Sequence, residues 1–179
     1  SPDKITNKGI ARTFQNIRLF KNLTVLDNIL IANHLHVKSN FLSYTTRMPW
    51  SRNEEKNMRR KSEMLLEKLG LLSLKNEIAH SLPYGEQRKL EIARALATDA
   101  KLLLLDEPAA GMNPSETMQL SSFIHTIRDE FELTIFMIEH HMDLVMEISD
   151  KIYVLDFGQL IAQGTADEVK NNKRVIEAY

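Results

Sequence analysis

The stretch that decides the fold is Lys101-Leu-Leu-Leu-Leu-Asp-Glu-Pro108, in which four leucines end in two adjacent carboxylates. Such a continuous apolar run, closed by a turn signal, predicts a strand in a parallel sheet that is covered on both faces. Open α/β sheets bind ligands at the carboxyl ends of their strands. An Asp there can hold Mg²⁺ beside a nucleotide, and an adjacent Glu can orient water. The stretch predicts Asp106 as a metal ligand and Glu107 as a general base, with a solvated acidic turn as the alternative.

Strands and helices alternate on both sides of this stretch. A hairpin-like return is expected over Gly158 to Gly164, and Thr165-Ala-Asp-Glu168 is a capping box for a final helix. Hydrophobic periodicity predicts the remaining elements, which are helices over 87–98, 115–131 and 141–148 and strands over 133–138 and 151–156.

The residues before the alternating strands and helices have two other patterns. A short apolar run that leads into a polar loop predicts a strand and then a loop within residues 1–20. Residues 21–84 are predicted to be helical, with a capped start at Thr24-Val-Leu-Asp27, a second helix from Asn53 to Gly70, and an irregular loop over 39–52. Residues 85–179 hold the alternating strands and helices. The predicted fold class is α/β, a parallel sheet with flanking helices and a helical segment inserted before its second part.

Composition narrows the possible functions. The chain has 179 residues, 43% of them hydrophobic and 26% charged, which suits one globular domain or two small lobes. A formal net charge of -1 gives no general attraction to nucleic acid or anionic lipid. The absence of cysteine excludes disulfides and thiolate metal sites. Because no apolar run reaches about 18 residues and the start has no signal-peptide pattern, neither a membrane span nor secretion is expected.

A second informative stretch is Leu82-Pro-Tyr-Gly-Glu-Gln-Arg-Lys-Leu-Glu-Ile-Ala-Arg-Ala-Leu96, a loop with one glycine that runs into an amphipathic helix. Gly85 would let the backbone approach a phosphate closely. The helix that follows would direct free N–H groups and the positive end of its dipole at the anion. Standing alone, the stretch is more often an ordinary capped core helix.

Two further polar positions follow predicted strands. Gln15 lies in the loop after the first strand, and Glu139-His140 follows the apolar strand over 134–138. A loop glutamine is usually solvated, and a histidine after a strand is usually structural. These two positions become informative because they occur in a fixed order with the 82–96 and 101–108 stretches. Together they form four motifs along the chain.

In this order, the four pieces resemble the motifs of ABC ATPases. The chain is most similar to ATP-binding subunits of branched-chain amino acid importers of the LivG type. The resemblance covers nearly the whole chain and implies a RecA-like P-loop NTPase core with an inserted helical subdomain that contacts a permease. The stretches that carry it are Gly9-Ile-Ala-Arg-Thr-Phe-Gln-Asn-Ile-Arg-Leu-Phe20, Leu82-Pro-Tyr-Gly-Glu86, Asp106-Glu-Pro-Ala-Ala-Gly-Met-Asn-Pro114 and Asn171-Asn-Lys-Arg-Val-Ile-Glu-Ala-Tyr179.

The resemblance assigns roles for a reaction that uses ATP and Mg²⁺. Gln15 would be the Q-loop residue that reaches the metal and the attacking water, with Asp106 on the metal and Glu107 as the base. His140, rather than His141, would be the switch histidine that contacts the γ-phosphate. Nucleotide contacts would come from the signature residues and the D-loop, namely Tyr84, Gly85, Glu86 and Asn113.

The sequence departs from the family pattern in several places. Pro83, Tyr84 and Glu86 stand where Ser, Gly and Gln are common in the signature, and Asn113 stands where many relatives have Asp. No Gly-x-x-x-x-Gly-Lys-Ser/Thr occurs, and none of the six glycines precedes a lysine. Because the family places this P-loop before Gln15, we expect a chain truncated ahead of the Q-loop. The full-length protein is expected to be an ATPase and the fragment to be inactive.

The resemblance also implies partners and a location. These are transmembrane permease subunits, a second ATP-binding subunit in a homodimer or heterodimer, and indirectly a periplasmic or extracellular solute-binding protein. The subunit would lie peripherally on the cytoplasmic face of the bacterial inner membrane. Three alternatives stay open: the ATPase of another ABC transporter, a non-catalytic interaction fragment, and a soluble ABC ATPase acting on nucleic acid or ribosomes. The last requires coiled-coil heptads or basic patches, which the sequence lacks, so no nucleic-acid partner is expected.

Overall fold

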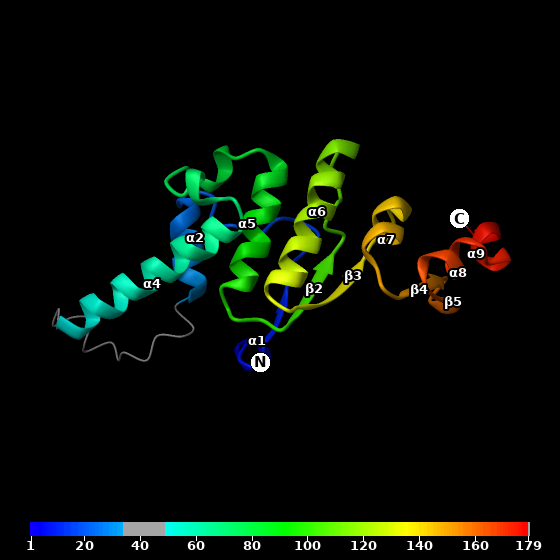
Figure 1. The fold of residues 1–179 in the computed structure, drawn as a ribbon, viewed down its shortest axis with the longest axis horizontal. Coiled ribbons are helices and arrows are strands. Elements are labelled where there is room, and N and C mark those ends of the chain that lie inside the picture. The colour runs from blue at the N-terminus through cyan, green and yellow to red at the C-terminus, as the bar shows by residue number, and fades with distance from the viewer. Residues whose placement is uncertain (34–48, 179) are drawn as a thin grey trace.

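The computed structural model describes residues 1–33 and 49–178. Helices α2 and α4 lie at one end of the molecule and the C-terminal helices at the other (Figure 1). The elements, with η for 3-10 helices, are α1 Pro2–Thr6, β1 Ile10–Arg12, α2 Val25–Asn33, α4 Pro49–Lys68, η2 Leu72–Leu74, η3 Ala79–Ser81, α5 Tyr84–Leu96, β2 Leu102–Asp106, α6 Pro114–Glu130, β3 Thr134–Ile138, α7 Met142–Ile148, β4 Ile152–Asp156, β5 Gln159–Gly164, α8 Ala166–Lys170 and α9 Lys173–Ala178.

The four leucines form the middle strand of a three-stranded parallel sheet in the order β1-β2-β3. Ile10 is opposite Leu102, and Asp106 is opposite Ile138. The predicted α/β class with a parallel sheet is therefore confirmed. All three strands end at the same edge of the sheet, so the residues that follow them are brought together there.

Helices α5 and α6 supply the main apolar layer against the sheet. Leu103 and Leu105 of β2 are buried in one core with Leu90 of α5 and with Leu120 and Ile127 of α6. Each fully buried side chain of this size contributes roughly 1.5–3 kcal/mol relative to an exposed one. This packing holds the carboxyl end of β2 on a rigid support.

Several predicted helix ends are confirmed because local hydrogen bonds define them. Thr24 Oγ1 accepts a hydrogen bond from the Asp27 amide at 3.0 Å where α2 begins. Gly70 follows α4 with φ of 71°, and the amides of Gly70 and Leu71 bond back to Glu67 and Leu66, as in a Schellman motif. Thr165 and Glu168 form the predicted capping box of α8.

Two predicted helix boundaries are wrong. Helix α5 begins at Tyr84, three residues before the start predicted at Gln87. Of the irregular loop predicted over 39–52, residues 39–48 lie outside the described residues, whereas residues 49–52 form the first turn of α4. Proline is favoured at the first position of a helix, so the proline there marks a helix start and not a loop.

The last two strands do not extend the parallel sheet. Strand β4 pairs antiparallel with β5 in a two-stranded sheet of its own, across a turn at Phe157 and Gly158. Both turn residues have positive φ, of 43° and 79°, as a type I′ turn requires. The hairpin and α8–α9 share a small core of Val154, Ala162 and Val169. The alternation of strand and helix suggested that β4 would join the parallel sheet. The short turn after β4 instead directs the chain back, so that β4 pairs with β5.

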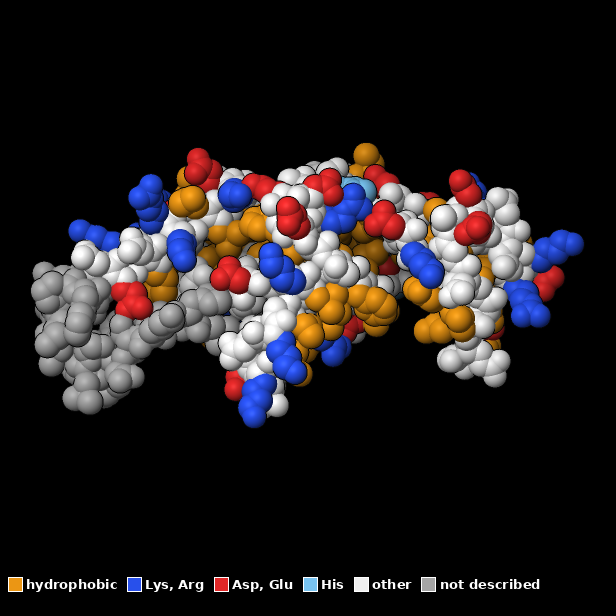
Figure 2. Space-filling view, turned by 60° about the horizontal axis from the view of Figure 1, so that its bottom comes forward, with side chains coloured by type: hydrophobic (Ala, Val, Ile, Leu, Met, Phe, Trp, Pro, Cys, Tyr) orange, Lys and Arg blue, Asp and Glu red, His pale blue; other side chains and the backbone are white. Residues whose placement is uncertain are grey.

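The sheet is not covered on both faces among the described residues. Phe136 and Ile138 of β3 are 56% and 57% exposed, and Leu155 and Leu160 of the hairpin are exposed to similar degrees. Figure 2 shows hydrophobic side chains on the surface both near the middle of the molecule and on the lobe formed by the C-terminal elements. Exposed apolar area of this kind favours association with other chains.

We therefore expect the 179-residue chain to self-associate as its concentration rises, since β3 offers both exposed apolar side chains and a free edge among the described strands. Light scattering over a concentration series measures this. Phe136→Lys should shift the series toward the monomer. Met118→Lys, at a 68% exposed site on α6, is the matched control and should leave it unchanged. A clean monomer at every concentration would contradict the expectation.

Candidate functional site

The turn after β2 places Glu107 in an unusual backbone conformation. Glu107 has φ of 42°, a left-handed value that side chains other than glycine seldom adopt. Its amide donates to the Ile138 carbonyl at 2.9 Å, and its carbonyl accepts from the Ala110 amide at 3.1 Å. Strained residues of this kind cost about 1–3 kcal/mol and cluster at functional sites. The end of β3 thus supports the conformation of Glu107.

Three of the predicted catalytic residues meet at this edge. Gln15 Nε2 donates to Glu107 Oε2 at 2.7 Å. His140 Nδ1 lies 3.8 Å from Glu107 Oε1. These side chains follow β1, β2 and β3 respectively, so the parallel register brings together residues more than 30 positions apart in the sequence. The contact with Glu107 is made by His140, while the ring of His141 bonds to Glu139.

Asp106, the predicted metal ligand, is paired with an arginine. Arg12 Nη2 donates to Asp106 Oδ2 at 2.9 Å, and the two side chains are 57% and 27% exposed. The sequence reading did not include Arg12. The donor set of a carboxylate at the strand end and the Gln15 side chain beside Glu107 supplies the hard oxygen ligands that Mg²⁺ prefers. By the chemistry of their oxygen atoms these residues fit the ion, which would compete with Arg12 for the Asp106 carboxylate.

The predicted signature residues occupy the first turn of α5 and not a loop before it. Tyr84 donates through its hydroxyl to the Ala110 carbonyl at 3.0 Å, and Glu86 pairs with Lys89 at 2.8 Å. A Cβ added at Gly85 would meet no described atom within 4 Å, so the glycine faces open space. No side-chain hydrogen bond caps the start of α5 at Pro83, where the positive end of the helix dipole lies.

Asn113 has a local role in the structure. Its side chain accepts a hydrogen bond from the Glu116 amide, and the Glu116 carboxylate accepts one from the Asn113 amide, both at 3.0 Å. This capping box starts α6 directly after the turn that carries Glu107. Its predicted contact with nucleotide stays a prediction.

Arg88 is a residue of this region that the sequence reading missed. Its side chain is fully buried and donates at 2.8 Å to the carbonyls of Phe14 and Gln15 and at 2.7 Å to Glu91. A further, longer contact joins it to the Tyr84 hydroxyl at 3.4 Å. Arg88 therefore ties the start of α5 to the backbone of the loop that carries Gln15.

Two more side chains of α5 hold the same loop. Glu91 accepts from the Arg18 amide at 3.0 Å, and Arg94 donates to the Arg18 carbonyl. A signal for this role was present in the sequence, because Arg88 lies four residues before the buried Ile92 and hence on the buried side of the helix. A charged residue at such a position requires partners.

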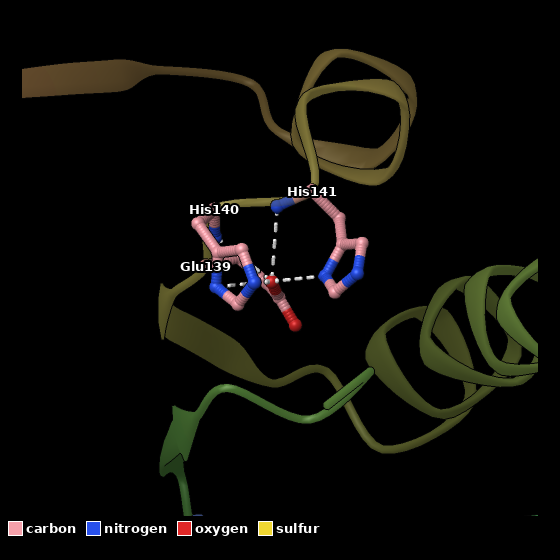
Figure 3. A group of neighbouring side chains, drawn as sticks. All are labelled: Glu139, His140 and His141. Atoms are coloured by element: carbon pink, nitrogen blue, oxygen red, sulfur yellow. Dashed lines mark hydrogen bonds and ion pairs between the residues drawn. The ribbon is translucent and has the colours of Figure 1, made fainter. Parts of the chain in front are cut away.

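Glu139, the residue before the candidate switch histidine, has a fully buried side chain. Its carboxylate accepts hydrogen bonds from the Ala109 amide and from the His141 ring, each at 2.9 Å. Figure 3 shows the rings of His140 and His141 on either side of this carboxylate. Burial by itself raises the pKa of Glu139. The hydrogen bonds from the His141 ring and from the amides of Ala109, His141 and His140 outweigh burial and bring the pKa below its ordinary value.

No helix among the residues that the structure describes combines the length and apolar character needed to cross a bilayer.

Comparison with known proteins shows the family to which this chain is similar. The ABC transporter family model matches residues 1–110, and a model for branched-chain amino acid ATP-binding cassette transporters matches residues 159–179. A high-affinity branched-chain amino acid transport ATP-binding protein, BraF of Pseudomonas aeruginosa, is 45% identical over 176 residues, which are 98% of this chain and 69% of that protein. LivG of Escherichia coli, described in the same words, is 44% identical with the same coverage.

Solved structures agree with the sequence relatives. The crystal structure of the ADP conformation of an ATP-binding cassette of an ABC transporter matches with a TM-score of 0.80 and 32% identity. The match covers 100% of this chain and 71% of that one. A nucleotide-free cassette matches with a TM-score of 0.76 and 31% identity. The α/β fold is thus the RecA-like fold of ABC ATPase cassettes, and the chain belongs to the family of ABC transporter ATP-binding proteins.

Proposed function

We propose that this chain belongs to the ATP-hydrolysing subunit of an importer for branched-chain amino acids. The observation that carries the proposal is the meeting of Gln15, Glu107 and His140 at the carboxyl edge of the sheet, with Gln15 Nε2 at 2.7 Å and His140 Nδ1 at 3.8 Å from Glu107. The relatives named for branched-chain amino acid transport support the cargo.

In this proposal, the three side chains share the work of hydrolysis. Bound ATP would supply the γ-phosphoryl group, which passes to water with ADP as the leaving group, and Mg²⁺ would neutralise the charge on the phosphates. Glu107 accepts the proton of the attacking water, and its hydrogen bond with Gln15 holds the carboxylate oriented for that task. His140 would contact the γ-phosphate. Asp106 and Gln15 would hold the metal, with Asp106 exchanging its Arg12 contact for the ion.

The remaining site residues fit a site shared by two subunits. The start of α5, with Tyr84, Gly85 and Glu86, has uncapped N–H groups that can bind an anion. We propose that it binds the nucleotide held by the second ATP-binding subunit, with Asn113 nearby. We further propose that the helical segment within residues 21–84 docks transmembrane permease subunits. The protein would then lie peripherally on the cytoplasmic face of the membrane, with a solute-binding protein acting through the permease.

Reconstitution tests the proposal. The full-length subunit, assembled with its permease in vesicles, should hydrolyse ATP faster when a solute-binding protein loaded with leucine, isoleucine or valine is added. Stimulation by a different solute would make it the ATPase of another ABC transporter. Stimulation by RNA or DNA without a permease would favour the soluble ABC ATPase instead.

The 179 residues by themselves are expected to bind ATP-Mg²⁺ weakly and to hydrolyse none above background. They contain no Gly-x-x-x-x-Gly-Lys-Ser/Thr, which supplies most phosphate contacts in P-loop proteins. Titration calorimetry with ATP and MgCl₂ measures the affinity, and the full-length subunit is the positive control. Micromolar affinity of the 179 residues alone would contradict this prediction.

A further inference from the structure

Within the proposed function, we propose that Glu139 is a positioning residue of the hydrolytic site. Its carboxylate fixes His140 relative to Glu107 by joining the segment after β3 to the turn after β2. Glu139 itself takes no part in the chemistry.

The contacts of Glu139 divide between these two segments. One oxygen, Oε2, accepts from the His140 amide at 2.8 Å, the His141 amide at 3.1 Å and His141 Nδ1 at 2.9 Å. The other, Oε1, accepts from the Ala109 amide at 2.9 Å. One carboxylate therefore bridges the backbone beside the candidate switch histidine and the backbone two residues after the candidate base.

Only a carboxylate satisfies this set of donors. Every partner is an N–H group, and an ionised carboxylate accepts hydrogen bonds through both oxygens without donating any. An isosteric glutamine would direct its NH₂ group at one side of the set and break the bridge there. Since the side chain is 0% exposed, water cannot replace the lost acceptor.

The position of Glu139 also separates its role from that of the reacting groups. His140 Nδ1 lies 3.8 Å from Glu107 Oε1 and 3.8 Å from Glu139 Oε2, so this ring nitrogen is equally near both carboxylates. Glu107 is 29% exposed and can meet a ligand, whereas Glu139 is enclosed. Glu139 can therefore act on the reaction only through the placement of its neighbours.

The bridge also supports the strained turn after β2. Glu107 keeps its left-handed φ because the surrounding structure holds the turn at several points. One is the bond from the Glu107 amide to Ile138, and another is the bond from Ala109 to Glu139. Both anchors come from the end of β3, so moving that segment would move His140 and the turn together.

Glu139, His140 and His141 lie close enough to suggest a metal site, with one ligand atom from each within 4.8 Å of the others. The bonds described above already use the Glu139 oxygens, however. We therefore assign the cluster to positioning.

The test uses Glu139→Gln in the full-length subunit. We expect kcat to fall about 10²-fold, the cost of a misplacement near 1 Å, with KM for ATP unchanged. Glu147→Gln, at an exposed carboxylate on α7, is the matched control and should keep parental activity. His141→Phe removes the ring donor while keeping a ring, and it should lower kcat less strongly. Because His141 is 38% exposed, that variant keeps the test decisive if Glu139→Gln does not fold.

A double-mutant cycle separates positioning from general stability. If Glu139 acts through His140, combining Glu139→Gln or His141→Phe with His140→Ala should lower kcat by clearly less than the product of the two single losses. Losses that multiply, or a parental kcat in the Glu139 and His141 variants, would overturn the inference. A full-length parent that hydrolyses no ATP would instead overturn the proposed function, on which the inference rests.

Discussion

Glu107→Gln in the full-length subunit is expected to lower ATP turnover by roughly 10²- to 10⁴-fold, the span associated with loss of a general base. Glutamine keeps the size of the side chain and can still bond to Gln15, but it cannot accept the proton of water. Nucleotide binding should be spared because Glu107 contributes no predicted phosphate or metal contact. ATP should then persist in the site.

Unhydrolysed ATP should hold two Glu107→Gln subunits together. Each nucleotide would be clamped between one subunit's phosphate-binding loop and the other's α5 start near Gly85. Size-exclusion chromatography with ATP and a phosphate-release assay measure dimer and turnover together. Asp106→Asn is the matched control at the adjacent carboxylate, and it should weaken Mg²⁺-dependent binding and give no stable dimer. If Glu107→Gln turns over ATP at the parental rate, the base lies elsewhere and His140 is the next candidate.

Arg88→Met is expected to destabilise the 179-residue chain by about 3–5 kcal/mol, the cost of removing one partner of a buried ion pair. Methionine has a similar length but donates nothing. The substitution leaves the buried Glu91 carboxylate without its 2.7 Å partner and the carbonyls of Phe14 and Gln15 without their donor. Urea denaturation followed by circular dichroism measures the free energy of unfolding.

Two variants make the Arg88 measurement specific. Arg59→Met removes an exposed arginine of α4 whose partner Glu63 lies 3.7 Å away, and it should cost much less. Arg88→Met combined with Glu91→Leu should recover part of the loss, because no buried charge is then left unpaired. A loss for Arg88→Met no larger than that for Arg59→Met would show that the Arg88 contacts contribute little.

The sequence alone determined the features that depend on neighbouring residues. The leucines at 102–105 predicted a strand of the sheet, with the carboxylates of Asp106 and Glu107 at its end. The Gly70 helix end and the capping box at Thr165 were likewise predictable, because their hydrogen bonds join residues at most five positions apart. The family resemblance rests on short motifs and on their order along the chain.

Only the tertiary structure decided how distant segments meet. Arg88 reaches carbonyls 74 and 73 positions away, and Glu139 reaches the Ala109 amide 30 positions away. The pairing of β4 with β5 and the exposure of Phe136 depend equally on which elements pack together. Periodicity reports which face of an element is apolar but not which partner covers it. Partner choice is settled by the packing of the whole chain, in which each buried polar group must also find its hydrogen bond.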